Sequence, residues 1–337
     1  MSTPARAPSK GGAHASPPPP RDRTSEALLK RLEWTVIRRL DGLLQGNYRT
    51  LWRGAGLDLA DLREYQHHDD VRHIDWNVTA RLQQPYVRQF TEDREMSAWF
   101  LVDLSGSVDF GSDATTKRGV AREFVGVLAR LLTRHGNRVG AILYGSAVDT
   151  VIPARSGRQQ VLHLLQRMAA RPDVSAPGST NLRDLLQAGQ RIVKRRSSVF
   201  VVSDFISAPG WEATLGQLAE RHEVTAVRLF DPLEMDLPDL GLVMMRDAET
   251  GEQLVVDTHD RGFRKRFAAV AERRENQLRE ALASAGVDTL ELATDDDLPN
   301  AILRFADLRK QRSRLANWSG KATAVPTHIS QWKAGAV

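Results

Sequence analysis

The sequence predicts an α/β fold, with a doubly wound, mostly parallel sheet and helices on both of its faces. From residue 97 onward, short apolar runs typical of buried strands alternate with segments whose apolar residues recur at helical spacing. Such alternation produces parallel strands joined by crossover helices. The chain has 337 residues, 41% of them hydrophobic and 26% charged. This length and composition suit one large α/β domain with additions.

The chain before residue 97 follows different patterns. Residues 1–24 are rich in Pro, Ser, Gly and Ala, and we expect them to form a disordered tail. Residues 25–96 are expected to form an N-terminal helix, ending near Gly46, and an irregular module that packs on the main domain. The helix is indicated by apolar residues every four positions, and the module ends in a strand at 86–90.

Residues 97–308 are predicted to form the main domain, and residues 309–337 a basic, flexible tail. Met244 and Met245 are expected to be core residues. The predicted elements of the main domain, in order, are strand 98–102, helix 115–134, strand 139–144, edge strand 148–152, helix 158–169, helix 181–194, strand 199–202, helix 211–221, strand 224–229, a β-hairpin insertion of 242–245 and 253–256, helix 260–285, strand 287–292 and helix 298–308.

The composition excludes several classes of protein and site. The chain has no cysteine, which excludes disulfides, zinc–thiolate sites, iron–sulfur clusters and a thiol nucleophile. No apolar run approaches the roughly 20 residues of a membrane-spanning helix. The first 30 residues lack the apolar segment of a secretory signal. We therefore expect a cytoplasmic protein.

The net charge of +5 is unevenly distributed. Residues 1–24 and 309–337 together hold ten basic residues and one acid, which leaves the middle of the chain net negative. A basic excess confined to the ends favours solubilising tails over a nucleic-acid surface. Peripheral contact with a membrane through the basic tail stays open.

Oxygen-bearing side chains stand where the predicted strands end. Asp103, Ser105 and Ser107 follow strand 98–102, Thr180 precedes the helix at 181, and Asp204 follows strand 199–202. Doubly wound sheets bind ligands beyond the carboxyl ends of their strands. An all-oxygen set suits Mg²⁺ or Mn²⁺, and neutral hydroxyl ligands would leave the cation open to a further anion. The alternative is that the first three residues only cap a helix.

This pattern resembles the metal-ion-dependent adhesion site (MIDAS) of von Willebrand factor A domains. Their motifs are Asp-x-Ser-x-Ser, a loop threonine and an aspartate after a later strand, and all five positions are filled here. The resemblance implies that Ser105, Ser107 and Thr180 bind the metal, with Asp103 and Asp204 acting directly or through water. It also implies that a carboxylate of a partner protein takes the remaining coordination position.

The upstream segment resembles a bacterial family called domain of unknown function 58, over about residues 30–310. The motifs that carry this resemblance are Gly54-x-Gly56, Arg63-x-Tyr65, Asp69-Asp70-x-Arg72-x-Ile74-Asp75-Trp76, Ala80-Arg81 and the hairpin of residues 241–257. His68 departs from the family, whose members usually carry glycine there. Members are commonly encoded beside a MoxR-type AAA+ ATPase, so the resemblance implies an adaptor in protein maturation or complex assembly.

We therefore expect a non-catalytic, metal-dependent protein-binding adaptor that works with a MoxR-type AAA+ ATPase and with a client protein offering an Asp or Glu to the metal. One alternative is a Mg²⁺-dependent phosphoester hydrolase, which needs a base and phosphate clamps. His135, His163 and His222 show no pairing with the motifs, and Arg183 is the one Lys or Arg beside them. A second alternative is an RNA- or lipid-binding adaptor driven by the charged tails.

Two polar clusters receive structural interpretations. The cluster from His67 to Asp75 has no recognisable metal-ligand spacing, so we expect its Asp and Arg residues to pair, with Trp76 packed beneath them. Asp295, Asp296 and Asp297 precede the last helix, where negative charge is favourable.

Overall fold

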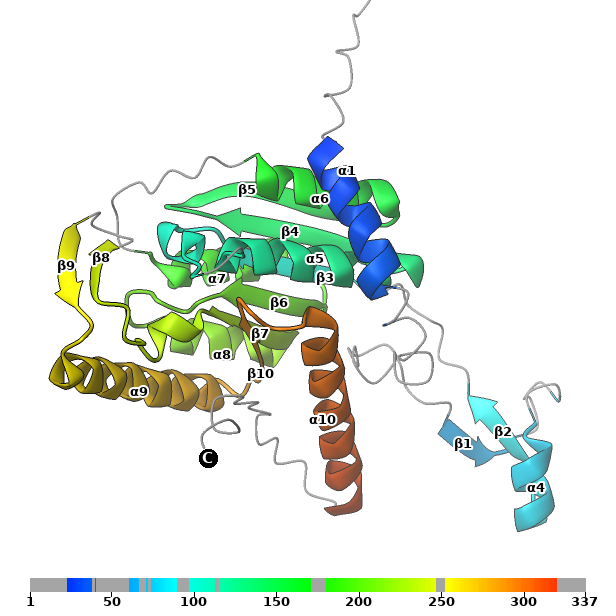
Figure 1. Ribbon diagram of the computed structural model, residues 1–337. Coiled ribbons are helices and arrows are strands. Elements are labelled where there is room, and N and C mark those ends of the chain that lie inside the picture. The colour runs from blue at the N-terminus through cyan, green and yellow to red at the C-terminus, as the bar shows by residue number, and fades with distance from the viewer. Residues whose placement is uncertain are drawn as a thin grey trace, which may run out of the picture.

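The computed structural model describes residues 23–37, 40, 61–66, 71, 74–89, 97–112, 115–170, 180–246 and 252–319. This part of the chain contains a six-stranded sheet flanked by helices and two separate two-stranded sheets (Figure 1). The α/β fold class predicted from the alternating pattern is therefore confirmed.

The central sheet is mostly parallel. Its strand order is β10-β7-β6-β3-β4-β5, and each neighbouring pair is parallel except β4 and β5. The edge strand predicted from residue 148 is confirmed, and the structure shows that it is antiparallel. The strands are β3 (Ser97–Asp103), β4 (Arg138–Tyr144), β5 (Val148–Arg155), β6 (Ser198–Ser203), β7 (Glu223–Phe230) and β10 (Asp288–Ala293).

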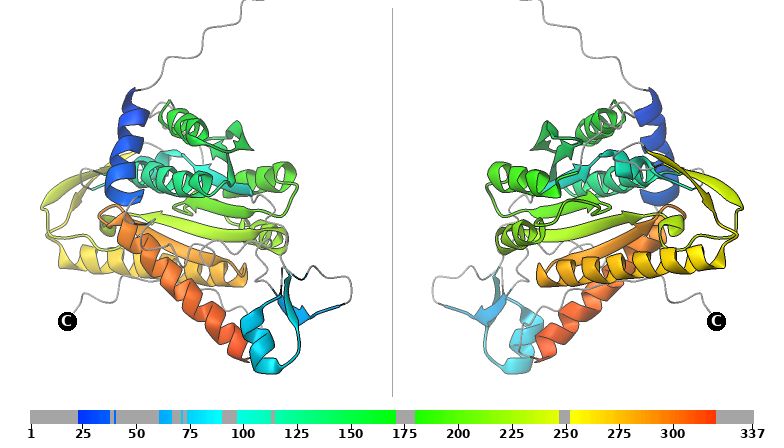
Figure 2. Two further views of the ribbon diagram at one scale, coloured as in Figure 1. Left: turned by 90° about the vertical axis from the view of Figure 1, so that its right-hand side faces the viewer. Right: turned by 90° about the vertical axis from the view of Figure 1, so that its left-hand side faces the viewer.

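Helices cover both faces of this sheet because successive strand residues point to opposite sides. In β3, Phe100 and Val102 join one buried cluster, whereas Trp99 and Leu101 join the other. The first cluster includes residues of α1 (Arg23–Leu32), α5 (Lys117–Arg134), α6 (Arg158–Ala169) and α10 (Leu298–Ser319). The second includes residues of α7 (Leu182–Ile192), α8 (Glu212–Arg221) and α9 (Arg261–Ser284). Figure 2 shows the two layers from the sides.

Helix α7 lies very close to the sheet. A Cβ atom on Gly189 would come 2.7 Å from Cδ2 of Leu101, so a larger residue here would have to displace the Leu101 side chain. This approach positions the start of α7, and with it the preceding Thr180, beside the end of β3.

The predicted N-terminal helix is present over residues 23–37 and at residue 40. After α1 the chain widens into a π-helical turn, η1 (Glu33–Ile37). Its buried apolar residues and those of α1 join one cluster with residues of α5 and α6. Residues 41–60, which include the predicted end of this helix, lie outside the described part of the chain.

Three further elements, β1 (Asp61–Glu64), α4 (Trp76–Leu82) and β2 (Tyr86–Gln89), form a small unit apart from the central sheet (Figure 1). Asp75 accepts a hydrogen bond from the Val78 amide at 3.2 Å and so caps α4. The expectation that Trp76 is packed is wrong, because it is 69% exposed. The remaining members of the cluster predicted from His67 onward lie outside the described residues.

Two predictions near the C-terminal half need correction. The hairpin forms as β8 (Leu242–Arg246) and β9 (Gln253–Asp257), but Met244 is 66% and Met245 37% exposed, so neither is a core residue. Helix α10 continues to Ser319, so the first part of the predicted flexible tail is helical. Arg309 holds this extension to the sheet by ion pairs with Glu223 and Asp288.

The longest helices of the chain carry many charges. The first six residues of α9 include four basic residues, and acids and bases are mixed from Glu272 to Glu280. Among the described residues, no helix combines the length and apolarity that crossing a membrane requires.

A buried ion network fastens α9 to the sheet. Arg228 of β7 contacts Oε1 of Glu275 at 2.7 Å and Oε1 of Glu291 at 3.3 Å. Arg279 adds a contact of 3.1 Å to Glu275. Burial raises the pKa of Glu291 to about 7, and the charge of Glu275 adds to the rise, while Arg228 opposes it.

This network makes stability depend on pH. Glu291 is more protonated in the folded than in the unfolded chain between its ordinary pKa of about 4.5 and about 7, so the free energy of unfolding falls as pH rises through that window. Glu291→Gln should remove this pH dependence. From pH 5 to pH 8, the free energy of unfolding of the variant should therefore rise by on the order of 1–3 kcal/mol relative to that of wild type. Urea unfolding at both pH values measures it.

The control for this prediction is Glu280→Gln on α9, since Glu280 is exposed. Its unfolding free energy should follow wild type at both pH values. A Glu291→Gln protein whose difference from wild type does not change with pH contradicts the assignment.

Candidate metal centre

The five predicted site residues lie at one edge of the central sheet. Asp103 ends β3, and Ser105 and Ser107 stand on the following turn, which includes η3 (Gly106–Asp109). Asp204 directly follows β6, which is the strand hydrogen-bonded beside β3. Thr180 lies just before α7, and all five residues are buried. The adjacency of β3 and β6 is what brings residues about a hundred positions apart together.

The Asp103 carboxylate is held from two sides. Its Oδ1 accepts the Ser105 amide at 2.9 Å, and its Oδ2 accepts the Ser203 hydroxyl at 2.7 Å. Burial first and the charge of Asp204 second raise the pKa of Asp103 to about 6, although these hydrogen bonds lower it. Two buried carboxylates that repel each other favour a cation between or beside them.

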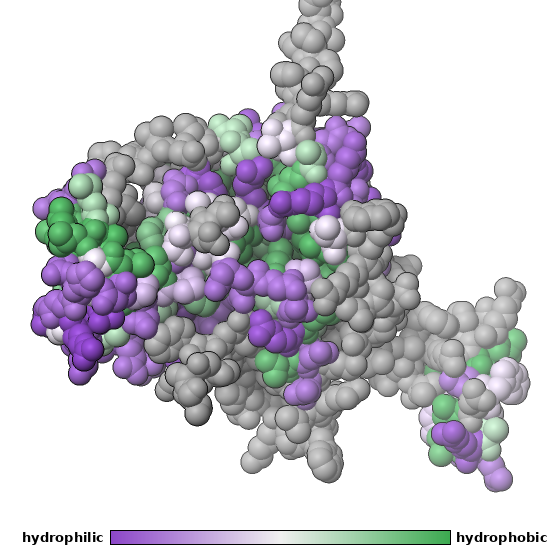
Figure 3. Space-filling model, viewed as in Figure 1, coloured by the Kyte–Doolittle hydropathy of each residue, from purple (hydrophilic) through white to green (hydrophobic). Residues whose placement is uncertain are grey.

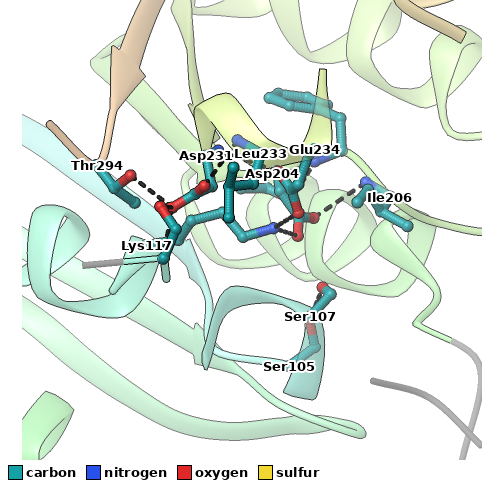
Figure 4. Close-up of polar contacts among 12 residues, drawn as sticks. Ser105, Ser107, Lys117, Asp204, Ile206, Asp231, Leu233, Glu234 and Thr294 are labelled. Atoms are coloured by element: carbon teal, nitrogen blue, oxygen red, sulfur yellow. Dashed lines mark hydrogen bonds and ion pairs between the residues drawn. The ribbon is translucent and has the colours of Figure 1, made fainter. Parts of the chain in front are cut away.

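The two serine hydroxyls are spaced as neighbouring ligands of a small cation. Their Oγ atoms lie 3.2 Å apart. In an octahedron with metal–oxygen bonds of about 2.1 Å, adjacent ligands are separated by about 3.0 Å. Figure 4 shows Ser105 and Ser107 on one side of Asp204. The residues present therefore fit Mg²⁺ or Mn²⁺.

Thr180 is fastened to the same edge by its backbone neighbours. Its carbonyl oxygen accepts the Ser207 hydroxyl and the Ala208 amide, each at 3.0 Å. The next residue, Asn181, donates its amide to the Tyr144 hydroxyl at 3.1 Å. Because Tyr144 ends β4 and Ser207 follows β6, the Thr180 loop is held from both sides of β3.

Asp204 is aimed by an unusual backbone turn. Phe205 has a φ of 58°, a left-handed conformation that is rare for a bulky residue. This turn lets Ser203 Oγ accept the Phe205 amide at 2.9 Å and Asp204 Oδ1 accept the Ile206 amide at 3.0 Å. Asp204 Oδ2 is left to face the start of α5.

Lys117 is the site residue that the sequence analysis missed. Its Nζ lies 2.8 Å from Asp204 Oδ2 and 2.6 Å from Glu234 Oε1, and the side chain is fully buried (Figure 4). Burial lowers the pKa of Lys117, but the two carboxylates outweigh it and raise that pKa above its ordinary value. The ammonium is therefore charged. A positive charge at the first position of a helix is unfavourable beside the positive end of the helix dipole. The sequence therefore contained one indication that Lys117 has acidic partners elsewhere in the fold.

The expectation that Arg183 is the one basic residue beside the motifs is therefore wrong. Its exposed guanidinium donates to the Gly210 carbonyl oxygen at 3.0 and 2.8 Å. It thus closes a loop on the surface, and the cationic contact within the site comes from Lys117.

Glu234 belongs to a segment whose side chains form hydrogen bonds with residues of three other parts of the chain. In η4 (Pro232–Glu234), Glu234 Oε2 accepts the Asp231 amide at 3.1 Å while Oε1 accepts Lys117. Asp231 Oδ2 accepts both the amide and the hydroxyl of Ser112 and the hydroxyl of Thr294. Burial raises the pKa of Asp231, but these hydrogen bonds outweigh it and keep that pKa below its ordinary value.

The carboxylates at this edge outnumber the ammonium groups that contact them. Asp204 and Glu234 contact the Lys117 ammonium, and Asp103 adds a third carboxyl group near Asp204. The described residues contain no group of three His, Asp or Glu side chains that could hold a metal by themselves. A cation at this edge would therefore need the serine and threonine hydroxyls as ligands.

The three histidines considered as bases for hydrolysis lie on or beside helices, as expected. His135 follows the end of α5, where its Nδ1 contacts the Leu131 carbonyl oxygen at 2.8 Å. His163 lies within α6, and His222 lies between α8 and β7. Burial lowers the pKa of both His163 and His222.

The chain resembles proteins whose functions are not described. A family model described as "Protein of unknown function DUF58" matches residues 61–277. An uncharacterized protein of Mycobacterium tuberculosis is 37% identical over 287 residues, covering 85% of this chain and 90% of that protein. An uncharacterized protein of Mycobacterium avium is 35% identical over 164 residues, covering 48% of this chain and 95% of that protein.

Two solved structures align with part of the chain at low sequence identity. The conserved hypothetical protein BatB of Bacteroides thetaiotaomicron aligns with a TM-score of 0.42 at 15% identity, covering 64% of this chain and 99% of that chain. An aerotolerance-related membrane protein of Bacteroides fragilis aligns with a TM-score of 0.43 at 13% identity, with the same coverage.

The Lys117 contacts predict a metal-sensitive stability. Lys117→Met leaves Asp204 and Glu234 without their shared counter-charge, so without metal it should lower the free energy of unfolding by about 3 to 5 kcal/mol. Saturating Mn²⁺ should recover part of this loss, because the dication supplies charge beside Asp204. Denaturant unfolding in EDTA and in Mn²⁺ measures both effects.

Lys30→Met is the matched control, because Lys30 is 68% exposed and its one ion pair, with Glu26, spans 3.8 Å. This change should cost less than about 1 kcal/mol in either buffer. A Lys117→Met protein as stable as wild type in EDTA would show that the buried ion pairs are not needed.

Proposed function

Because the chain belongs to the family described as protein of unknown function DUF58, we propose its function from its own site: a metal-dependent, non-catalytic protein-binding adaptor with a von Willebrand factor A-like MIDAS. The single observation that carries this proposal is the pair of buried serine hydroxyls, 3.2 Å apart, beside two buried carboxylates.

In this proposal the hydroxyls of Ser105, Ser107 and Thr180 bind Mg²⁺ or Mn²⁺. Each oxygen of Asp103 and Asp204 already accepts a hydrogen bond, so these carboxylates act mainly through charge or through water. A cation held by neutral hydroxyls keeps much of its charge and attracts a further anion. The Asp or Glu of a client protein fits that role, and its bond to the cation supplies direction and selectivity.

The site lacks the groups that hydrolysis needs. Among the described residues, no histidine faces Asp103 or Asp204, and Lys117 is occupied by two carboxylates. This arrangement supports binding over phosphoester hydrolysis, which requires a base beside the attacking water. Metal-dependent phosphatase turnover by the purified chain, lost in Asp204→Ala, would instead favour the hydrolase.

The proposed ATPase partner has a separate basis. The resemblance in the segment before residue 97 supports an adaptor for a MoxR-type AAA+ ATPase. In that role, the metal centre would hold the client while the upstream module or another surface contacts the ATPase.

Metal binding is the first test of this proposal. Wild type should bind one Mn²⁺ per chain, and Asp103→Ala should weaken binding by about tenfold or more, because a buried charge beside the cation is lost. Asp109→Asn is the matched control, since Asp109 is in the same loop but pairs with Arg118 at 2.6 Å. Isothermal titration with Mn²⁺ measures both affinities. Equal loss in the two variants, or no Mn²⁺ binding by wild type, contradicts the site.

Partner capture is the second test. Immobilised wild type with a MoxR-type ATPase should retain a client in Mg²⁺ and release it in EDTA, whereas Asp109→Asn should behave as wild type. Asp103→Ala should not retain it in either buffer, because the client carboxylate has no cation to bind. Client that stays bound in EDTA, or on Asp103→Ala, would show that capture does not use the metal.

A further inference from the structure

Lys117 places a positive charge inside the protein, directly beside the proposed metal centre. Hydrophilic side chains, drawn in purple in Figure 3, lie at the surface over much of that view, but the Lys117 side chain is 0% exposed. Its ammonium contacts Asp204 Oδ2 at 2.8 Å and Glu234 Oε1 at 2.6 Å. Apolar side chains often replace a buried ion pair at little cost in stability, so packing alone does not explain this charge.

The Asp204 carboxylate is held between Lys117 and Ile206, which lie on opposite sides of it (Figure 4). Its Oδ1 accepts the uncharged Ile206 amide at 3.0 Å, whereas its Oδ2 accepts the charged ammonium at 2.8 Å. An oxygen that binds an ammonium has less charge to offer a second cation, and a dication on the same oxygen would be repelled by the ammonium. Lys117 therefore weakens Asp204 as a direct ligand.

The ammonium is held in place from its other side. Glu234 Oε1 accepts it, while Glu234 Oε2 accepts the Asp231 amide at 3.1 Å. The Asp231 carboxylate in turn accepts the Ser112 hydroxyl at 2.9 Å and the Thr294 hydroxyl at 2.7 Å. Because a buried charge that loses a partner is strongly destabilising, the ammonium stays beside Asp204.

The position of Lys117 is also tied to the turn that carries Ser105 and Ser107. Phe110 follows η3, the short helical turn that contains Ser107. The Lys117 amide donates to the Phe110 carbonyl oxygen at 2.9 Å, and Nζ lies 6.0 Å from the centre of the Phe110 ring. The ammonium is thus fixed relative to the serine turn as well as to Asp204.

We propose that Lys117 is a positioning residue of the metal centre, which prevents Asp204 from binding the cation directly and so makes the cation take a carboxylate from another molecule. This inference rests on the proposed function, because it concerns the cation that Ser105 and Ser107 hold in that proposal. An ammonium has no free electron pair, so Lys117 is not a ligand and acts through Asp204. The ligand selected in this way is a carboxylate anion rather than a neutral oxygen group.

The affinities for the cation and for the outside carboxylate change in opposite directions when Asp204 becomes a direct ligand. A direct Asp204 ligand would hold the cation more tightly, fill one of its coordination positions and neutralise part of its charge. The cation would then attract a second carboxylate less strongly. With Lys117 in place, the chain loses some affinity for the cation and gains affinity for the outside carboxylate.

Lys117→Met in the full chain tests this role with Mn²⁺ and acetate as probes. Without the ammonium Asp204 can become a direct ligand, so Mn²⁺ should bind about tenfold more tightly. Acetate should bind the Mn²⁺-loaded variant about tenfold more weakly than loaded wild type, and one fewer water should remain on the Mn²⁺. Isothermal titration gives the Mn²⁺ affinity, water-proton relaxation the acetate affinity, and electron paramagnetic resonance in isotopically enriched water the number of bound waters.

Arg118→Met is the matched control, because it removes the same charge from the next residue of α5. The Arg118 guanidinium pairs with Asp109 at 2.6 Å, so Lys117 stays beside Asp204 in this variant. Both affinities should change by less than about threefold. Shifts equal to those of Lys117→Met would show that net charge alone acts, and would overturn the proposal. A Lys117→Met chain that loses both affinities together would overturn it as well, because a purely structural role has that effect.

Glu234→Gln tests the same contact without removing Lys117, and it decides the matter if Lys117→Met does not fold. Of the two carboxylate partners of the ammonium, only Asp204 then remains, so the ammonium should bind Asp204 more strongly. Mn²⁺ should bind about threefold or more weakly, and acetate should bind at least as tightly as in wild type. Mn²⁺ binding as tight as in wild type, or weaker acetate binding, would contradict the role of Lys117.

Wild-type measurements separate this role of Lys117 from the metal centre itself. A wild type that binds no Mn²⁺ removes the metal centre, and the role of Lys117 with it. A wild type that binds Mn²⁺ and acetate, beside a Lys117→Met chain with both affinities unchanged, overturns only the role of Lys117. Acetamide is similar to acetate in size but uncharged, and it should not bind. Acetamide that binds the loaded wild type as tightly as acetate would overturn the selection of a carboxylate.

Discussion

The buried ammonium of Lys117 is the constraint on which the candidate site depends. It bridges Asp204, which follows β6, and Glu234, which ends η4, and it does so from the first residue of α5. Three segments distant in the sequence thus meet at one charge that water does not reach. Taking these charges out of water is costly unless all stay paired, so the ion pairs fix the relative positions of the segments rather than simply adding stability.

That constraint also decides which side chains remain for a cation. The carboxylate oxygens of Asp103 and Asp204 accept hydrogen bonds that orient both side chains. The turn that orients Asp204 requires the strained, left-handed φ of Phe205. The hydroxyls of Ser105 and Ser107 remain at a separation suited to a small octahedral ion. In such a site the hydroxyls bind the cation directly, while the carboxylates act on it through their charge. Because its direct ligands are neutral, the cation can still bind a carboxylate from another molecule.

Sequence patterns predicted the central sheet well because each strand is a short apolar run buried on both faces, as in β3 and β6. They also placed the five site residues at one edge, since parallel strands end together. Lys117 escaped prediction because its partners lie 87 and 117 positions away. Met244, Met245 and Trp76 were assigned to packed positions because an apolar pattern shows what can be buried, not what covers it.

The edges of the sheets explain why the hairpin differs from the rest of the fold. β5 ends the central sheet with Asp149, Pro153 and Arg155, residues that discourage strand addition. At the opposite edge, Arg309 of α10 binds Asp288 of β10. β9 carries charge at Asp257 and at the preceding Glu252, and its exposed Leu254 and Val255 lie between them. The hairpin edge is therefore less protected against strand addition than either edge of the central sheet.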